Sequence, residues 1–440
     1  MSHRSIAAAP GSVYEGAAPY RATALAVAVA GLLTLLAPLP ADGQEVASPP
    51  PTPSVADSLP RASLPSRRAA DSLPTPRLDL PADALRVAAA ERLPEAIRRR
   101  AVSVCSGGDV AFGTNLSESW RRPAAARWGV SESGLPSPHD LADRIGGLMP
   151  PADIVLLNVE GALGDEEVPP KCAPGSTACY AIRMPPESAD ALRTIAPHAT
   201  VVGTVANNHA RDAGPQGFAT TRRLLAEAGI LVTGADSLAS PLVVAPGDTI
   251  GVLGFGTSPG TVTDLRDMAA VRRHVERAKQ RYGRVVVTAH LGAEGVDAQR
   301  TSNETEIFYG TSRGNPVEFA HTVVDAGASL VIGHGPHVLR AIEWRGDALI
   351  AYSLGNLLTF GPFSTAEPLN RGAVFCARIG PGGAVQEAAL VPTVQPVAGL
   401  LQRDPELRAA TLFDSLSVLD FPTTGARVTP AGRVRRPQPR

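Results

Sequence analysis

Two histidines follow a short apolar run near residue 330. Of all residue pairs in the chain, this one most clearly could bind a metal ion or transfer a proton. The nine residues Ser329–His337 read SLVIGHGPH. Leu330–Ile332 has the β-branched, apolar character of a buried strand. Gly333 then allows a tight turn before the imidazoles of His334 and His337. In open α/β sheets, ligand-binding and catalytic residues lie at the carboxyl ends of the strands, and these histidines occupy such a position. The alternative interpretation is that they are a pair of surface loop histidines.

Four other strand-like runs are also followed by side chains that can bind a metal ion or transfer a proton. These side chains are Asp109, Glu160, the run Asn207-Asn208-His209 and His290. Each of them alone could be a turn former, a helix cap or a surface residue. Five strand ends of this kind together indicate one shared site. Carboxylate, amide oxygen and imidazole donors suit borderline divalent ions such as Mn²⁺, Fe or Zn²⁺.

The segments between these runs are predicted to be crossover helices, which gives a repeated order of strand, ligand and helix. One helix is predicted to begin at Asp264 as N-cap, because apolar residues recur three and four apart from Met268 to Tyr282. A second is predicted to begin at Asn315-Pro316. His321 lies off the apolar face of its helix and His274 lies among arginines, so both are expected to be solvated.

The N-terminal part of the chain has a different composition. Residues 1–43 contain the apolar stretch Ala22–Leu39 with a basic flank and small residues beyond it, as in an export signal. A cleaved signal peptide and a retained membrane anchor both remain open, because the stretch is nearly long enough to span a bilayer. Residues 44–81 are rich in proline, serine and alanine and are predicted to be a disordered linker. Residues 82–400 are then expected to form one domain, with a mobile tail at 401–440.

Charge and cysteine content narrow the function classes. The chain has 440 residues and a formal net charge of -1, which does not favour nucleic acid as a partner. Cys105 and Cys376 lie in apolar runs and are expected to be buried thiols. Cys172 and Cys179 flank a short loop in a chain expected to be exported, so a disulfide between them is predicted.

Six motifs occur in an order that identifies a resemblance. They are GGDVAFG, ADIVLLNVEGAL, VVGTVANNHARDAGPQGF, VVVTAHLGAEG, DAGASLVIGHGPHV and IAYSLGNLL, between about Val102 and Leu358. In this the chain resembles the CapA/PgsA-type bacterial capsule biosynthesis proteins, which are associated with poly-γ-glutamate capsules and belong to the calcineurin-like metallophosphoesterase superfamily. The resemblance implies a four-layer α/β sandwich, with two mixed sheets facing each other and helices outside.

The resemblance also implies a role for each site residue. The implied metal ligands are Asp109, Glu160, Asn208, His290, His334 and His337. Glu160 would bridge two ions, and His209 would act as general acid, oriented by Asp212. The superfamily has a histidine where this chain has Ala111, so the resemblance implies one or two bound ions.

The resemblance therefore implies a metal-dependent hydrolase-like protein that acts in the synthesis, attachment or processing of an anionic surface polymer such as poly-γ-glutamate. It would be exported and associated with the cell envelope, with membrane-bound capsule synthesis subunits as further partners. A non-catalytic polymer-binding or assembly subunit is the alternative. A phosphodiesterase for nucleotides or lipids is a third possibility, although no aromatic cluster for stacking a base is evident.

Overall fold

The computed structural model describes residues 100–114, 118–165, 171–172, 180–235, 242–245, 248–258 and 264–437. The predicted export segment and linker lie outside these residues. In the part of the chain that the structure describes, no helix is both long enough and apolar enough to cross a membrane.

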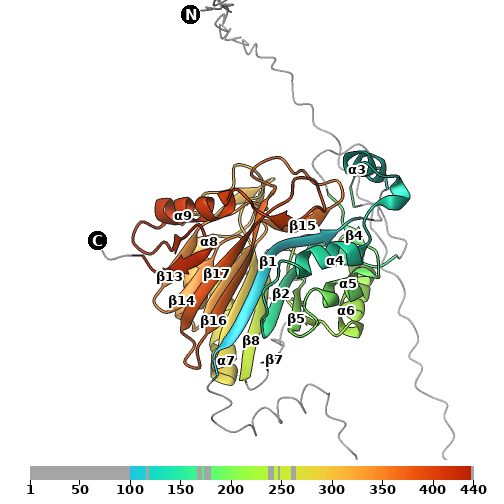
Figure 1. The fold of residues 1–440 in the computed structure, drawn as a ribbon. Coiled ribbons are helices and arrows are strands. Elements are labelled where there is room, and N and C mark those ends of the chain that lie inside the picture. Colours follow the sequence, from blue (N-terminus) through green and yellow to red (C-terminus); the bar gives the residue numbers. More distant parts are fainter. Residues whose placement is uncertain are drawn as a thin grey trace, which may run out of the picture. The chain divides into compact units, whose positions relative to one another are not determined.

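Ten strands of the described residues form a mixed sheet around the long strand β1. The strands are β1 (Val102–Phe112), β2 (Ile154–Val159), β5 (Thr200–Thr204), β6 (Leu231–Thr233), β15 (Asn356–Phe360), β16 (Arg371–Ile379), β17 (Val385–Val394), β18 (Gln402–Arg403), β19 (Arg427–Val428) and β20 (Arg433–Arg435). Their order is β19-β20-β17-β16-β1-β2-β5-β6, with β15 beside β1 and β18 beside β17. Strand β1 is parallel to β2 and antiparallel to β16, which Figure 1 shows on its two sides.

Six strands of the described residues form a second mixed sheet. They are β7 (Leu242–Ala245), β8 (Asp248–Gly256), β9 (Val285–His290), β12 (Leu330–His334), β13 (Ile342–Arg345) and β14 (Ala348–Ala351), in the order β13-β14-β12-β9-β8-β7. Strands β9 and β12 are parallel and wholly buried. Burial on both faces explains why their sequences are continuous apolar runs without alternation.

The two sheets face each other, and helices cover their outer faces. One apolar core between the sheets joins residues of β1 and β2 to residues of β8, β9 and β12. A second core packs the larger sheet against α3 (Arg121–Trp128), α4 (Pro138–Gly146), α5 (Ser188–Thr194) and α6 (Gly214–Glu227). A third packs the smaller sheet against α7 (Met268–Tyr282) and α8 (Pro316–Asp325). The predicted four-layer sandwich of two mixed sheets is therefore confirmed (Figure 1).

Of the two helix caps predicted from the sequence, one is confirmed and one is wrong. Asn315 caps α8 as predicted, because its side chain accepts hydrogen bonds from two backbone N–H groups of the first turn. The predicted cap of α7 is wrong: Asp267, not Asp264, accepts a hydrogen bond from the N–H of Ala270 at 2.9 Å. Asp264 instead pairs with the guanidinium of Arg266. The two aspartates are three residues apart, and the sequence pattern did not distinguish them.

One of the two helix histidines also departs from expectation. His274 is half-buried beside Arg277, as befits the polar side of α7. His321 is not simply solvated, because its Nε2 lies 2.9 Å from Oε2 of Glu343 on β13. The ring is on the flank of α8 and reaches the neighbouring sheet, a contact that helical periodicity does not reveal.

The predicted tail after residue 400 is ordered structure in residues 401–437, so this prediction is wrong there. Helix α9 (Arg408–Asp420) buries Ala409, Ala410 and Phe413 in the core between the sheets. Strand β20 pairs with β17, and β19 pairs with β20. The strands are only two or three residues long, too short to show alternation, and α9 buries mostly small residues. The folded domain therefore extends well beyond Leu400.

The cysteines of the apolar runs are joined rather than free. Cys105 of β1 and Cys376 of β16 stand opposite each other in the antiparallel pair and form a disulfide, with their Cα atoms 4.1 Å apart. The prediction of two buried thiols is wrong, because a separation of 271 residues hides the pairing from the sequence. Cys172 is also disulfide-bonded. Its predicted partner, Cys179, lies outside the described residues.

Candidate metal centre

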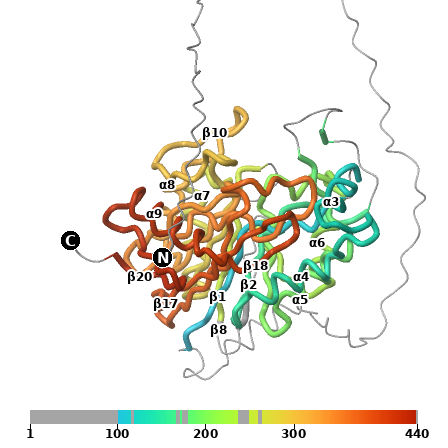
Figure 2. Tube along the Cα trace, turned by 45° about the horizontal axis from the view of Figure 1, so that its top comes forward, coloured from blue at the N-terminus to red at the C-terminus, as the bar shows by residue number. Residues whose placement is uncertain are grey.

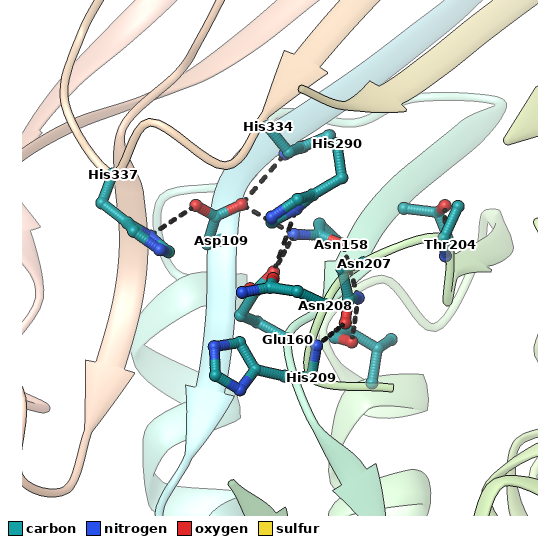
Figure 3. Close-up of polar contacts among 12 residues, drawn as sticks. Asp109, Asn158, Glu160, Thr204, Asn207, Asn208, His209, His290, His334 and His337 are labelled. Carbon is teal, nitrogen blue, oxygen red and sulfur yellow. Dashed lines mark hydrogen bonds and ion pairs between the residues drawn. The ribbon is translucent and has the colours of Figure 1, made fainter. Parts of the chain in front are cut away.

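The predicted site residues come from both sheets and meet where the carboxyl ends of their parallel strands lie together (Figure 3). Asp109 is in β1, Glu160 follows β2, and Asn208 follows β5. His290 and His334 are the last residues of β9 and β12 and stand opposite each other in the parallel register. Because the two sheets face each other, one sheet supplies the oxygen donors and the other supplies the imidazoles.

Asp109 is one of two fully buried carboxylates of the site. Its side chain is fully buried, and Oδ1 accepts a hydrogen bond from Nδ2 of Asn158 at 2.7 Å. Nδ1 of His334 lies 3.3 Å from Oδ1, and Nδ1 of His337 lies 3.0 Å from Oδ2. Burial alone would raise the pKa of Asp109, but these two imidazoles hold it well below its ordinary value. Asp109 is therefore an anion in the folded protein.

Glu160 has the opposite electrostatic character. It is fully buried, and its Oε2 accepts a hydrogen bond from the same Asn158 amide that serves Asp109. Burial and the negative charge of Asp109 raise the pKa of Glu160 well above its ordinary value. Two buried carboxylates in one site repel each other, and a cation between them would relieve that repulsion.

His290 and His334 complete the inner part of the site. Nδ1 of His290 lies 3.5 Å from Oε2 of Glu160. Burial and the nearby charge of Arg313 lower the pKa of His290 well below its ordinary value, so the ring is neutral. Neutral imidazole is the form that coordinates metals. Gly335, at a φ of +108°, brings the chain so close that a Cβ there would lie 3.0 Å from Nε2 of His290.

His337 lies at the outer side of Asp109. The residue has a φ of +60°, a backbone conformation that is unusual for a residue with a Cβ. Its Nδ1 also lies 3.1 Å from Oδ1 of Asn356, which stands opposite Asp109 in the β1–β15 register. Burial would lower the pKa of His337, but the contact with the negatively charged Asp109 carboxylate raises it to about 10.

His209 and Asp212 form a separate pair beside these residues. Nδ1 of His209 lies 2.6 Å from Oδ2 of Asp212, and both side chains are buried. Asp212 also accepts a hydrogen bond from the N–H of Ile182 at 2.8 Å and pairs with the ammonium of Lys171. Asp212 is thus held by three donors, and its contact with Nδ1 leaves Nε2 of His209 as the nitrogen that can exchange a proton.

Asn158, Glu294 and Arg313 lie at the site but are not among the residues predicted from the sequence. Asn207, which the sequence did indicate, donates through Nδ2 to Oδ1 of Asn158 at 3.1 Å and so fixes the amide between the two carboxylates. Glu294, four residues after His290, pairs with Arg313. The strand-end pattern could have pointed to Asn158, but nothing in the sequence connects Glu294 to Arg313.

The donor atoms of this site fit a divalent metal ion. The buried polar atoms without a hydrogen-bond partner include Asp109 Oδ2, Glu160 Oε1, Asn208 Oδ1, His290 Nδ1 and both ring nitrogens of His334. Ligand atoms of Asp109, Glu160 and His290 all lie within 4.8 Å of one another. Buried polar atoms are normally satisfied, so a convergent group of unsatisfied oxygens and nitrogens is what a metal site requires.

Comparison with known proteins assigns the chain to a family. The sequence model of the family described as "Bacterial capsule synthesis protein PGA_cap" matches residues 103–360, more than half of the chain and all of the strand ends described above. This protein belongs to that family. Membership supports a role in capsule polymer synthesis, and the resemblance to the bacterial capsule biosynthesis proteins is confirmed.

Individual relatives agree with the family assignment. A "Probable polyglutamine synthesis accessory protein" of Mycobacterium tuberculosis is 29% identical over 307 residues, which cover 58% of this chain and 74% of that protein. The "PGA biosynthesis protein CapA" of Bacillus subtilis is 30% identical over 170 residues, which cover 35% of this chain and 41% of that protein. The chain is also similar to a 5'-nucleotidase precursor from Thermus thermophilus of known crystal structure, with 67% of this chain and 54% of that chain covered, at 14% identity and a TM-score of 0.32.

Proposed function

We propose that this protein is a metal-dependent hydrolase of the cell envelope that acts in the synthesis, attachment or processing of an anionic capsule polymer such as poly-γ-glutamate. The observation that carries the proposal is the convergence of buried, unpartnered ligand atoms from both sheets. Family membership supplies the polymer context. The chemistry rests on the side chains of this chain alone.

The site residues divide into a metal-binding group and a proton-transfer group. Asp109, Glu160, Asn208, His290, His334 and His337 would hold one or two divalent ions, with Mn²⁺, Fe and Zn²⁺ suited to this mixture of donors. Such ions act as Lewis acids on a phosphoryl or carbonyl oxygen. Asn158 keeps the two carboxylates apart and in fixed orientations through its hydrogen bonds to both.

His209 is the residue that would move a proton. Its Nδ1 is held by Asp212, so Nε2 can donate a proton to the leaving group of a cleaved bond. The pair is buried, which fixes the ring, and Asp212 itself is fixed by Lys171 and the N–H of Ile182. A scaffold protein has no need for such an acid, so this pair favours catalysis over the alternative of a non-catalytic assembly subunit.

The disulfides support export to the cell envelope. Cys105–Cys376 joins two strands of the folded domain, and Cys172 is also disulfide-bonded. Disulfides persist in oxidising compartments and are rare in the reducing cytosol of most cells. This agrees with the export signal predicted at residues 1–43.

The test compares two histidine variants in metal content and in function. His290→Ala removes a proposed ligand, so the metal content of the purified protein should fall. His209→Ala removes only the proposed acid, so metal content should stay near wild type while turnover of a phosphodiester or of poly-γ-glutamate falls ~10²–10⁴-fold. The non-catalytic alternative predicts that His209→Ala supports capsule production as well as wild type.

His198→Ala is the matched control, because His198 is exposed and lies outside the site. It should keep both metal and turnover. If wild type turned over neither substrate and His209→Ala kept full capsule output, the catalytic proposal would be wrong and the assembly role would replace it. Full turnover by His209→Ala would show that His209 is not the acid.

A further inference from the structure

A short hairpin beside the metal centre presents apolar side chains to solvent. It consists of β10 (Ile307–Phe308) and β11 (Thr311–Ser312), joined by Tyr309 and Gly310. Tyr309 is 74% exposed and Ile307 is 56% exposed, and among the exposed large hydrophobic residues of the described chain only Leu419, at 57%, lies between them. Figure 2 shows the hairpin, labelled β10, projecting from the rest of the trace.

The tip of the hairpin carries a conformational cost that an exposed tyrosine does not offset by packing. Tyr309 has a φ of +45°, a region in which glycine and asparagine are favoured and aromatic residues are rare. Its ring touches only the neighbouring ring of Phe308 among the aromatic contacts of the described residues, at 4.4 Å between centroids. Unfavourable backbone conformations of this kind concentrate at ligand-binding sites.

The base of the hairpin is fixed to the loop that follows His290. Glu306 accepts hydrogen bonds from Arg340 at 2.8 Å through both oxygens and from the N–H of Ala293 at 2.6 Å. Arg313 pairs with Glu294, and its Nη2 lies 3.4 Å from Nε2 of His290. The hairpin and the metal centre therefore share one rigid support.

A continuous row of side chains leads from the site to the tip. The guanidinium of Arg313 lies 6.0 Å from the ring centroid of Phe308, and Phe308 contacts Tyr309. The four steps along the chain from Tyr309 to Arg313 would span at most about 13 Å at ~3.3 Å per residue, and the turn at Tyr309 and Gly310 shortens this distance. A ligand that lies at the metal centre and also contacts the tip must extend along the hairpin, as a linear polymer can.

The charged side chains at the base of the hairpin are paired with one another, so the apolar tip determines which ligand the hairpin can contact. Glu306 pairs with Arg340, Glu294 pairs with Arg313, and Arg266, which donates to the carbonyl of Ser312, pairs with Asp264. The tip itself offers an aromatic ring and an isoleucine. It therefore suits the carbon backbone of a polymer better than its charged groups, which can stay in water.

We propose that the β10–β11 hairpin is a polymer-binding arm, in which Tyr309 and Ile307 hold the carbon backbone of the extended anionic polymer while one of its bonds lies at the metal centre. The inference rests on the proposed function, since it takes the same polymer as substrate. The arm gives the site a preference for chains over small esters.

The test measures polymer binding by the purified full-length protein. The probe is fluorescein-labelled poly-γ-glutamate of defined length, and the readout is fluorescence anisotropy.

The hairpin variants are Tyr309→Asn, which suits the positive φ but lacks the ring, and Ile307→Ser. The matched control is Val130→Ser, because Val130 is 40% exposed in the segment after α3. The Kd of each hairpin variant should rise roughly tenfold, which corresponds to about 1.4 kcal/mol. The Kd of Val130→Ser should not change.

Two further measurements separate the possible outcomes. Tyr309→Asn should unfold at a temperature no lower than wild type, so weaker binding cannot be ascribed to misfolding. Hydrolysis of bis(p-nitrophenyl) phosphate, a substrate too small to reach the tip, reports on the metal centre. Suppose that wild type holds metal and cleaves this ester, and that the hairpin variants bind polymer as well as wild type. The hairpin is then not a polymer-binding arm, and the proposed function stands. If wild type neither holds metal nor cleaves the ester, the proposed function fails by itself.

Two other results would overturn the proposed polymer-binding role of the hairpin. Absence of measurable affinity of wild type for the labelled polymer would overturn the proposal. So would a loss of binding to anionic phospholipid vesicles in the hairpin variants with polymer binding intact, because the tip would then be a membrane contact.

Discussion

Asn158 shows how one neutral side chain can hold a charged site together. Its Nδ2 donates to both Asp109 and Glu160, and its Oδ1 accepts from Asn207. Glu160 lies two residues after Asn158, but Asp109 and Asn207 come from other strand ends and no spacing in the sequence links them to Asn158. The sequence predicted which strand ends carry donors, because each donor directly follows its own apolar run. It could not predict which polar atoms bond to one another across strands 49 residues apart.

Replacement of this amide by a carboxylate gives a first prediction. Asn158→Asp puts a third carboxylate between Asp109 and Glu160 and removes both hydrogen bonds. The free energy of unfolding of the metal-free protein should fall by about 3 kcal/mol, as expected when a buried charged group loses its partner. Added Mn²⁺ should raise the unfolding temperature of Asn158→Asp by more than that of wild type. Equal metal-free stability of the two proteins would show that Asn158 does not separate the carboxylates.

At the scale of elements, Glu343 joins α8, β13, β14 and the segment after α9. Its carboxylate accepts hydrogen bonds from Tyr352 at 2.7 Å and Thr424 at 2.8 Å, and it contacts His321 at 2.9 Å. Hydrophobic periodicity predicted the helix and the apolar strands. It did not predict this network, because a polar residue on the flank of a helix looks solvated until the neighbouring sheet is placed.

The network predicts a specific dependence of stability on pH. Burial would raise the pKa of Glu343, but the hydrogen bonds from His321 and Tyr352 lower it below its ordinary value. The stabilisation is therefore fully present above the unfolded-state pKa of about 4.3 and is lost as pH falls through the lower folded-state pKa. Glu343→Gln should lower the free energy of unfolding at pH 7 by about 1–3 kcal/mol, and by less at pH 3.

Urea unfolding at pH 7 and pH 3 measures this difference. Glu276→Gln on the exposed side of α7 is the control and should match wild type at both values. A deficit for Glu343→Gln that is the same at pH 3 as at pH 7 would mean that the charge of Glu343 does not stabilise the network.

At the scale of the whole molecule, the sandwich is closed by contacts between distant parts of the chain. The Cys105–Cys376 disulfide joins β1 to β16, and the C-terminal residues add α9 and three short strands to the domain. The layered fold followed from the repeated order of strand, ligand and helix together with the motif resemblance. The disulfide and the C-terminal packing did not, because contacts across hundreds of residues leave no local pattern.

Removal of the Cys105–Cys376 disulfide should lower the stability of the fold and leave the metal site intact. The double variant Cys105→Ala/Cys376→Ala should unfold with a free energy roughly 2–5 kcal/mol lower than wild type, because the unfolded chain is no longer constrained. Asp109 lies four residues further along β1, still paired with β2 and β15, so metal content should not change. Thermal or urea unfolding without reductant tests the first part. A double variant as stable as wild type would contradict it.

If the two sheets together form a metal site, the purified protein should contain bound metal. The full-length protein, produced with export and supplied with Mn²⁺ or Zn²⁺, should retain one or two ions per chain after dialysis when measured by inductively coupled plasma mass spectrometry. His334→Ala should retain fewer, because both nitrogens of His334 are buried without a hydrogen-bond partner. His198→Ala should match wild type. A wild-type protein that retains no metal, or a His334→Ala protein that retains as much as wild type, would show that these residues do not form a metal site.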